Sequence, residues 1–178
     1  AAQSRAIAQA SAEGRNLARS LAEHMTLSVR AIDLSLRHLR DDWIRDPGSF
    51  AAAVVRQREL LEDEAVHQIL VLGKNGRTVY GSLPTWQPLD AGDRPYFSVH
   101  KQRATDELYI SDPVLGRVVR KWTIRFTRTI HDRQGQFAGV MVFSVPPPAL
   151  ERIYNDIQLG ERGAITLVRS DGQVLARS

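Results

Sequence analysis

Hydrophobic residues in the first quarter of the chain follow a single stripe that is typical of one long α-helix. Residues 15–46 contain neither Gly nor Pro. Apolar residues recur there in steps of three and four, at Leu17, Leu21, Met25, Val29, Ile32, Leu36, Leu39 and Trp43. This spacing places them on one helical face. With the Ala-rich start, the pattern predicts a helix of about 40 residues, roughly 60 Å long at 1.5 Å per residue.

Two further leucines, Leu27 and Leu34, lie off this stripe. Helices much longer than about 25 residues usually project from their domain, dimerise or do both. We therefore expect one face of the helix to pack on its own domain and another to form a homodimer. A simple amphipathic helix folded on its own core is the alternative.

After residue 46 the hydrophobic period changes from that of a helix to that of strands. Asp46-Pro47-Gly48 stops the first helix and begins a second one over residues 50–62. Strand-like segments follow at 66–72 and 77–83, joined by the turn Gly73-Lys74-Asn75-Gly76, and then at 107–111, 117–131 and 136–145. A short helix is expected at 94–100. These elements predict an α+β fold with a five-stranded antiparallel sheet and covering helices.

The last two predicted strands differ in their patterns. Residues 117–131 alternate between an apolar face, which includes Trp122, and a polar face, which includes Arg125, but Arg120 and Arg128 fall on the apolar face. Residues 136–145 are almost continuously apolar, as expected for a central strand that is covered on both sides.

The run Pro146-Pro147-Pro148 is the clearest boundary in the chain. A helix is expected over 149–157, and residues 163–178 repeat the strand, turn and strand pattern of the first hairpin. The pattern thus divides the chain into a long helix at 1–46, an α+β domain at 47–147, and a helix with a hairpin at 148–178.

Composition and motifs argue against several classes of function. The 24 basic residues are scattered among 20 acidic ones, without the block of like charge expected of a nucleic-acid-binding protein. There is no Cys, no pair of His residues at metal-ligand spacing, no nucleophile motif and no phosphate-binding loop. We therefore expect neither catalysis, nor a metal, nor a cofactor. The longest apolar stretch, 137–145, is much shorter than the roughly 20 residues that span a bilayer.

Several short pieces of the sequence are informative through their order and spacing. They are Asp93-Arg94-Pro95-Tyr96-Phe97, Leu108-Tyr109-Ile110-Ser111-Asp112-Pro113-Val114, Gly116-Arg117, Trp122-Thr123-Ile124, Thr127-Arg128, Gly135-Gln136-Phe137-Ala138-Gly139-Val140, Leu159-Gly160-Glu161-Arg162-Gly163 and Asp171-Gly172-Gln173-Val174-Leu175-Ala176-Arg177. With these pieces, the sequence resembles the double Cache sensors, which are PAS-like domains of bacterial histidine kinases, chemoreceptors and diguanylate cyclases. The resemblance implies a signalling and dimerisation helix at 1–46, a membrane-distal ligand-binding domain at 47–147, and the linker helix and first hairpin of a truncated membrane-proximal domain at 148–178. The resemblance implies an extracytoplasmic, periplasmic part of an inner-membrane protein. Its transmembrane segments and its cytoplasmic output domain, a histidine kinase or a diguanylate cyclase, would lie outside this chain.

The resemblance also implies a small-molecule pocket between the sheet and its covering helix. The candidate ligand-binding residues are Arg94, Tyr96, Tyr109, Asp112, Trp122 and Ser144. A guanidinium group matches the two oxygens of a carboxylate, so Arg94 is the first candidate for the ligand's anionic group. The alternative is that Arg94 pairs with Asp90 or Asp93 and braces the loop. Asp112 has the alternative role of capping the turn before Pro113.

Two positions depart from the amino-acid-binding members of this family. Those proteins hold the ligand's ammonium group with an Asp where this chain has Ser144, and they have a Tyr where this chain has Val114. An amine therefore loses a charged partner, and we expect a small carboxylate or similar anion as the ligand, not an ordinary α-amino acid. The competing interpretation is a ligand-free structural dimerisation module of the same kind of receptor.

Overall fold

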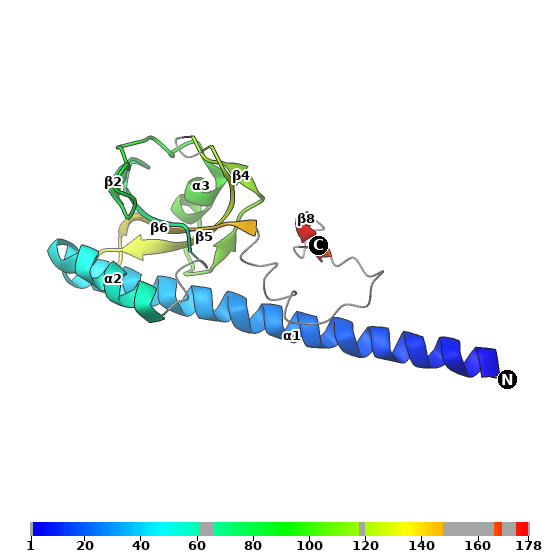
Figure 1. The fold of residues 1–178 in the computed structure, drawn as a ribbon. Coiled ribbons are helices and arrows are strands. Elements are labelled where there is room, and N and C mark those ends of the chain that lie inside the picture. Colours follow the sequence, from blue (N-terminus) through cyan, green and yellow to red (C-terminus); the bar gives the residue numbers. More distant parts are fainter. Residues whose placement is uncertain (1, 61–65, 118–119, 148–165, 169–173, 178) are drawn as a thin grey trace.

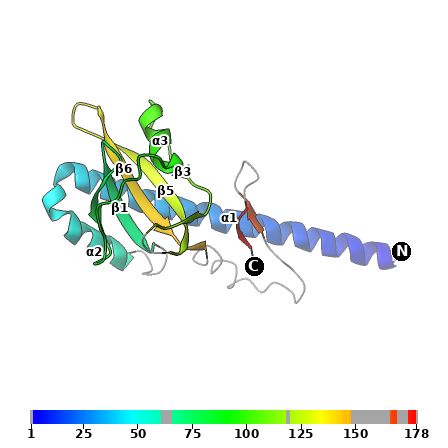
Figure 2. The same cartoon turned by 90° about the horizontal axis from the view of Figure 1, so that it is seen from above.

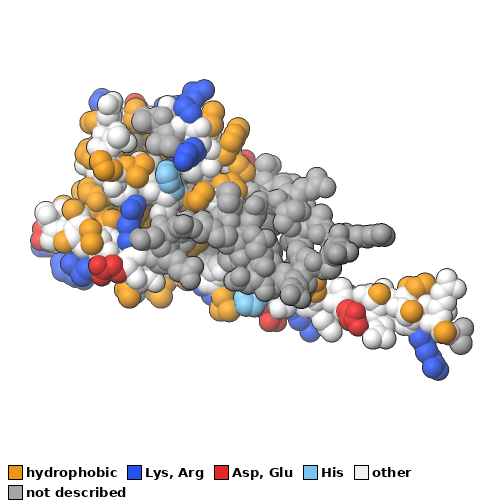
Figure 3. Space-filling model, in the orientation of Figure 1, with side chains coloured by type: hydrophobic (Ala, Val, Ile, Leu, Met, Phe, Trp, Pro, Cys, Tyr) orange, Lys and Arg blue, Asp and Glu red, His pale blue; other side chains and the backbone are white. Residues whose placement is uncertain are grey.

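The chain begins with one long helix, as the sequence predicts. The computed structural model describes residues 2–60, 66–117, 120–147, 166–168 and 174–177, and α1 spans Ala2–Arg45. Its buried residues begin at Leu21, and none lies in the turns before it. The N-terminal half of α1 extends beyond the sheet (Figure 1), and its N-terminal end projects in the space-filling view (Figure 3).

The end of α1 is set by Asp46. Its carboxylate accepts a hydrogen bond from the backbone N–H of Gly48 at 3.0 Å, which caps the short 3₁₀-helix η1 (Pro47–Ser49). The chain then reverses into α2 (Phe50–Leu60), which lies beside α1 (Figure 1). Gln57 of α2 donates to the hydroxyl of Ser35 on α1 at 2.7 Å, so the helix pair is joined by a polar contact as well as by apolar packing.

An antiparallel sheet of six strands covers this helix pair. The strands are β1 (Gln68–Gly73), β2 (Thr78–Gly81), β3 (Tyr109–Ile110), β4 (Val114–Leu115), β5 (Trp122–His131) and β6 (Phe137–Val145). Their order is β2-β1-β6-β5-β3, and β4 also pairs with β5. The sequence predicted one strand at 107–111, but two two-residue strands flank the bend at Asp112-Pro113 and bring the count from five to six. Seen from above, the strands cross α1 obliquely (Figure 2).

The α1 side of the sheet holds the main core. Alternation along the strands brings apolar side chains of β1, β5 and β6 onto the buried face of α1 and onto α2. The central residues of this layer, Ile69, Phe126 and Phe143, are cross-strand neighbours and are each about 1% exposed or less. Burial of this layer fixes which face of β5 points away from α1.

The opposite side of the sheet carries α3 (Pro95–Gln102). Here Leu72, Val140 and Val142 of the sheet pack against Tyr96 and Phe97 of the helix. The central strand β6 is therefore covered on both sides, as its continuous apolar run predicts. The α+β class and the antiparallel sheet with covering helices are confirmed.

The C-terminal segment is described only in part. β7 (Thr166–Val168) and β8 (Val174–Arg177) pair antiparallel, which matches the strand pair expected within 163–178. The predicted boundary near Pro148 and the linker helix over 149–157 lie outside the described residues. The assignment of this hairpin to a second PAS-like unit therefore stays a prediction. Within the described residues, no helix combines the length and the apolar character needed to span a bilayer.

Candidate functional site

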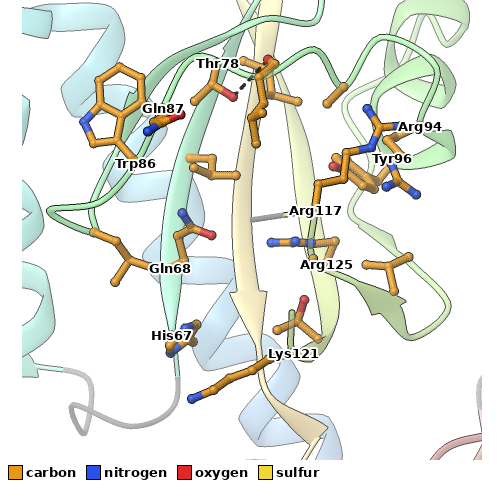
Figure 4. A pocket seen from close by; sticks show the side chains of 18 of the residues that line it. His67, Gln68, Thr78, Trp86, Gln87, Arg94, Tyr96, Arg117, Lys121 and Arg125 are labelled. Atoms are coloured by element: carbon orange, nitrogen blue, oxygen red, sulfur yellow. Dashed lines mark hydrogen bonds between the residues drawn. The ribbon is translucent and has the colours of Figure 1, made fainter. Parts of the chain in front are cut away.

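A pocket lies on the α3 side of the sheet. Its floor comes from β1 and β5, and its walls come from the loop of residues 83–94, the start of α3 and the segment 114–117. Figure 4 shows side chains from these elements pointing into one space, with Arg94 and Tyr96 at the side of α3 and with His67 and Lys121 at the other end. Elements far apart in the sequence thus meet at this pocket.

The register of the sheet places a polar row across the pocket floor. Gln68 of β1 and Arg125 of β5 are both cross-strand partners of Ser144 on β6. Directly opposed residues share a face of the sheet, so all three side chains lie on the side away from α1. The next row contains Leu70, Val142 and Thr127, so the sheet becomes more apolar in this direction.

Arg125 is the most deeply buried cation of the pocket. It is 7% exposed, its guanidinium donates a hydrogen bond to the Ser144 hydroxyl, and its charged carbon lies 5.8 Å from the centroid of the Tyr96 ring. Its Nε has no hydrogen-bond partner among the described residues. Removal from water lowers the pKa of Arg125 from its ordinary value, and the nearby Arg94 charge acts in the same direction. No described carboxylate forms an ion pair with it.

Arg94 lies at the N-terminus of α3 and lines the same pocket. The two carboxylates that would brace it are engaged elsewhere. Asp93 pairs with Arg117 at 2.8 Å, and the carboxylate of Asp90 accepts from the backbone N–H of Gly92 at 2.8 Å. The hydrogen bond from Arg117 holds the pKa of Asp93 below its usual range. The loop is thus braced through Arg117, and Arg94 faces the pocket without an ion pair among the described residues.

Charge in the pocket is strongly unbalanced. Among the described lining residues, one carboxylate, Asp90, stands against four cationic side chains, which are Arg94, Arg117, Lys121 and Arg125. His67 also lines the pocket, and its pKa is lowered first by burial and then by the charge of Lys121. Near neutral pH His67 is therefore uncharged, and the excess positive charge of the pocket comes from Arg and Lys.

Unpaired polar atoms concentrate at the same place. Within the described part of the chain, four buried side-chain polar atoms lack a hydrogen-bond partner, and three of them belong to pocket-lining residues. These three are Nε2 of His67, Oγ1 of Thr123 and Nε of Arg125. Buried polar groups are nearly always paired, so a group of unpaired ones around a pocket marks a place where a polar ligand or water completes the bonding.

The position of α3 over the sheet is fixed by a buried histidine. His100 accepts or donates at both ring nitrogens, with Thr127 at 2.7 Å from Nε2 and Thr129 at 2.9 Å from Nδ1. Burial lowers the pKa of His100 to about 4, so the ring is neutral near pH 7. These contacts hold α3 to β5 and thereby set where Arg94 and Tyr96 stand relative to Arg125.

The six ligand-binding residues predicted from the sequence do not all lie at the pocket. Arg94 and Tyr96 line the pocket, and Ser144 lies beneath it as the hydrogen-bond acceptor of Arg125. Tyr109 is outside the lining and packs edge-on against the His100 ring, with centroids 6.3 Å apart. Asp112 is exposed and also outside the lining.

Trp122 requires a correction. The sequence placed it in the core and among the ligand-binding candidates, but it is 59% exposed and does not line the pocket. Trp122 is the first residue of β5, and it shares the α1-side face with Ile124 because strand side chains alternate. The pocket lies on the other face, where Thr123 and Arg125 point.

Four basic residues of the pocket lining were not predicted from the sequence: His67, Arg117, Lys121 and Arg125. The signal for Arg125 was present, because the apolar run of the neighbouring strand predicted cover on both sides of the sheet. Because β6 is covered on both faces, the polar face of the neighbouring strand β5 is also covered and is not exposed to solvent. The described residues contain no group of three or more His, Cys, Asp and Glu side chains placed to hold a metal ion.

Comparison with known proteins gives a consistent result for the whole chain. A family model described as Cache domain matches residues 1–178. The extracellular domain of a protein described as a histidine kinase, rpHK1S-Z16, has a TM-score of 0.87 and 28% sequence identity, covering 96% of this chain and 71% of that one. No curated protein sequence matches the chain.

Two chemoreceptor domains share the fold at lower similarity. The ligand-binding domain of Pseudomonas aeruginosa PctB in complex with L-Arg has a TM-score of 0.66 and 19% identity, over 86% of this chain and 63% of that one. The domain of Pseudomonas fluorescens CtaA in complex with L-serine has a TM-score of 0.65 and 17% identity, over 91% and 72%.

Proposed function

The chain belongs to the Cache domain family, and we propose that it is the extracytoplasmic sensor domain of a transmembrane signalling protein that binds a small carboxylate-type anion. The observation that carries this proposal is the pocket lining, in which four cationic side chains face one carboxylate among the described residues. A pocket with this charge attracts anions and repels amines.

Arg94 is the proposed partner of a ligand carboxylate. It lines the pocket, it stands at the start of α3, and neither Asp90 nor Asp93 forms an ion pair with it in the described part of the chain. The planar guanidinium presents two parallel N–H groups that match two carboxylate oxygens. Tyr96, at the start of α3 and buried, supplies an aromatic wall beside the Arg125 charge.

We further propose that ligand binding changes the position of α1 and that α1 relays the signal. The sheet carries the pocket on one face and α1 on the other, so a ligand that favours one arrangement of the sheet also favours one arrangement of α1. The exposed leucines Leu27 and Leu34, 61% and 52% exposed, provide a surface for a second copy of α1. The output domain is proposed to be a histidine kinase or a diguanylate cyclase.

A thermal-shift screen of the purified chain tests ligand class directly. The panel contains small carboxylates, α-amino acids, purines and polyamines, each at a concentration far above its expected dissociation constant. A ligand present at 100 times its dissociation constant stabilises the native state by about 2.7 kcal/mol, which raises the melting temperature measurably. We expect hits among carboxylates and none among polyamines.

The matched variants are Arg94→Ala and Arg77→Ala. Arg77 is an exposed arginine outside the pocket lining, so its loss tests for a general effect of net charge. The carboxylate response should vanish in the first variant and persist in the second. A response to amino acids alone would contradict the carboxylate assignment, while leaving the sensor role intact.

A ligand-free dimerisation module is the second candidate. One observation favours it: Arg125 already has the Ser144 hydroxyl and the Tyr96 ring as partners within the chain. This alternative predicts no response to any class of compound, with Arg94→Ala melting at the same temperature as the parent.

A further inference from the structure

Arg125 is a cation in an unfavourable position. Its side chain is taken out of water at 7% exposure, and its described partners are a hydroxyl and an aromatic ring, neither of which carries a full negative charge. A buried charge costs several kcal/mol unless it is paired with an opposite charge and fully hydrogen-bonded. In addition, Nε of Arg125 is a buried donor without a hydrogen-bond partner among the described residues.

The other pocket cations increase this cost. Arg94 is half-buried, and Lys121 and Arg117 are exposed, so positive charge extends from the floor of the pocket outward. Burial lowers the pKa of Arg125 and the Arg94 charge lowers it further, while burial lowers the pKa of His67 and the charges of Lys121, Arg58 and Arg125 add to that effect. Arg117 is already paired with Asp93, but Arg94, Lys121 and Arg125 have no ion pair among the described residues, and one negative charge would balance only one of these three.

We propose that Arg125 is the deep anion anchor of the pocket and that the ligand carries two anionic groups, one bound by Arg125 and the other by Arg94. This inference rests on the proposed function of the same pocket as an anion site. The deep group would accept hydrogen bonds from Nε of Arg125 and from the hydroxyl of Thr123, two donors that lack partners among the described residues. Both side chains leave β5 on the same face, two residues apart, and both line the pocket.

The same arrangement disfavours α-amino acids. An ammonium group next to the deep carboxylate site would face Arg125, and the neighbouring strand offers only the Ser144 hydroxyl, which already accepts a hydrogen bond from that guanidinium. The proposed ligand class is therefore a small dianion, such as a dicarboxylate, without a cationic group.

Matched pairs of compounds test this on the unaltered chain. Titration calorimetry compares malonate with propionate, succinate with butyrate, and glutarate with valerate, so that each pair differs mainly in its second carboxylate; inorganic phosphate serves as a compact control anion. We expect at least one dicarboxylate to bind roughly 100-fold more tightly than its monocarboxylate partner, because the second ion pair is partly desolvated.

Two substitutions on the same side of the pocket separate an anchor from a general positive field. Arg125→Met and Lys121→Met each remove one positive charge from the pocket lining, but Lys121 is exposed. The first should lower dicarboxylate affinity by about 100-fold and the second by less than about 5-fold, because screened rim charges contribute little. The melting temperature without ligand should not fall in Arg125→Met, because the variant removes an uncompensated buried charge; a structural arginine would give a fall.

The possible results separate the dianion proposal from the proposed function as a carboxylate sensor. Equal affinity for both members of every pair would overturn the dianion assignment while supporting a carboxylate sensor. Equal losses in the two variants would overturn the role of Arg125 as anchor. Binding of no anion by the unaltered chain would remove both proposals.

Discussion

Arg128 of β5 and Asp33 of α1 form a two-point ion pair through the core side of the sheet. Nε and one terminal nitrogen of Arg128 lie 2.6 and 2.8 Å from the two carboxylate oxygens of Asp33, and the side chains are 12% and 17% exposed. Arg125, three residues earlier on the same strand, points to the opposite face and into the pocket. One strand thus joins the pocket floor to the long helix.

This ion pair should contribute substantially to stability. Asp33→Asn leaves the Arg128 guanidinium largely buried with its charge partly unpaired, and we expect a loss of about 2–4 kcal/mol in the free energy of unfolding. Urea denaturation measures the change. The control is Arg45→Met, which removes an exposed pair with Asp42 and should cost under about 0.5 kcal/mol. Similar values for the two variants would show that the Arg128–Asp33 pair does not hold α1 to the sheet.

His100 should make the domain sensitive to acid. Its pKa is about 4 in the folded chain, mainly through burial, against an ordinary value of 6.5, so below pH 6.5 the unfolded chain binds a proton that the folded chain does not. The stability that neutral His100 gives is complete above pH 6.5 and is lost as the pH falls toward 4.

The difference between the parent and His100→Gln isolates this effect, because the acidic residues titrate in both proteins. Melting temperatures measured from pH 7.5 to 4 should fall more steeply in the parent, by a difference that corresponds to up to about 3 kcal/mol. Parallel curves would mean that His100 is protonated in the folded chain without penalty.

Gly139 on β6 should tolerate no side chain. It has φ of +153°, and a Cβ there would overlap the backbone carbonyl of Leu72 on β1. Gly139→Ala should therefore separate the central strands and abolish cooperative unfolding or lower its midpoint strongly, as followed by circular dichroism. Gly135→Ala is the matched control, because Gly135 also has positive φ (+77°) but no atom near its Cβ, and it should cost only about 1 kcal/mol. Equal losses of stability in the two variants would show that positive φ alone, and not overlap with Leu72, makes Gly139 necessary.

The exposed leucines of α1 give a test of the proposed homodimer. Leu27→Glu with Leu34→Glu places charge on the surface expected to meet a second α1, while the core face of the helix stays unchanged. Light scattering coupled to size exclusion should show a dimer for the parent and a monomer for the double variant. Val79→Glu, at an exposed strand position with 49% exposure, is the control and should leave the mass unchanged. An identical mass for the parent and the double variant would contradict the proposal.

Most of the fold could be predicted from the sequence because its main elements have long, regular hydrophobic patterns. The stripe from Leu17 to Trp43 predicted α1, and the apolar run at 137–145 predicted a central strand covered on both sides. The strands at Tyr109–Ile110 and Val114–Leu115 are too short for any periodicity, so one of them was not predicted. Trp122 was wrongly predicted to be in the core, because alternation shows which face of a strand a residue lies on but not how far along the strand that face is covered by other elements.

The site was harder to predict because its residues depend on tertiary pairing. Arg128 stood out on an apolar face, but its partner Asp33 lies 95 residues away and belongs to no local pattern. In the sequence, Arg125 is one of several polar residues on a strand face. Only the register that sets it beside Ser144, with α3 overhead, turns this polar face into a pocket floor.

The most direct test of the central claim is the NMR signal of the Arg125 Nε–H group, identified by its absence in Arg125→Met. This N–H has no partner among the described residues, so a bound anion should change its environment more than that of any exposed arginine. On titration with the dicarboxylate that gives the largest thermal shift, we expect a saturating downfield shift of the Arg125 Nε–H signal, with the same dissociation constant as calorimetry. If the dicarboxylate binds and the Arg125 signal does not move, Arg125 is not the anion anchor of the pocket.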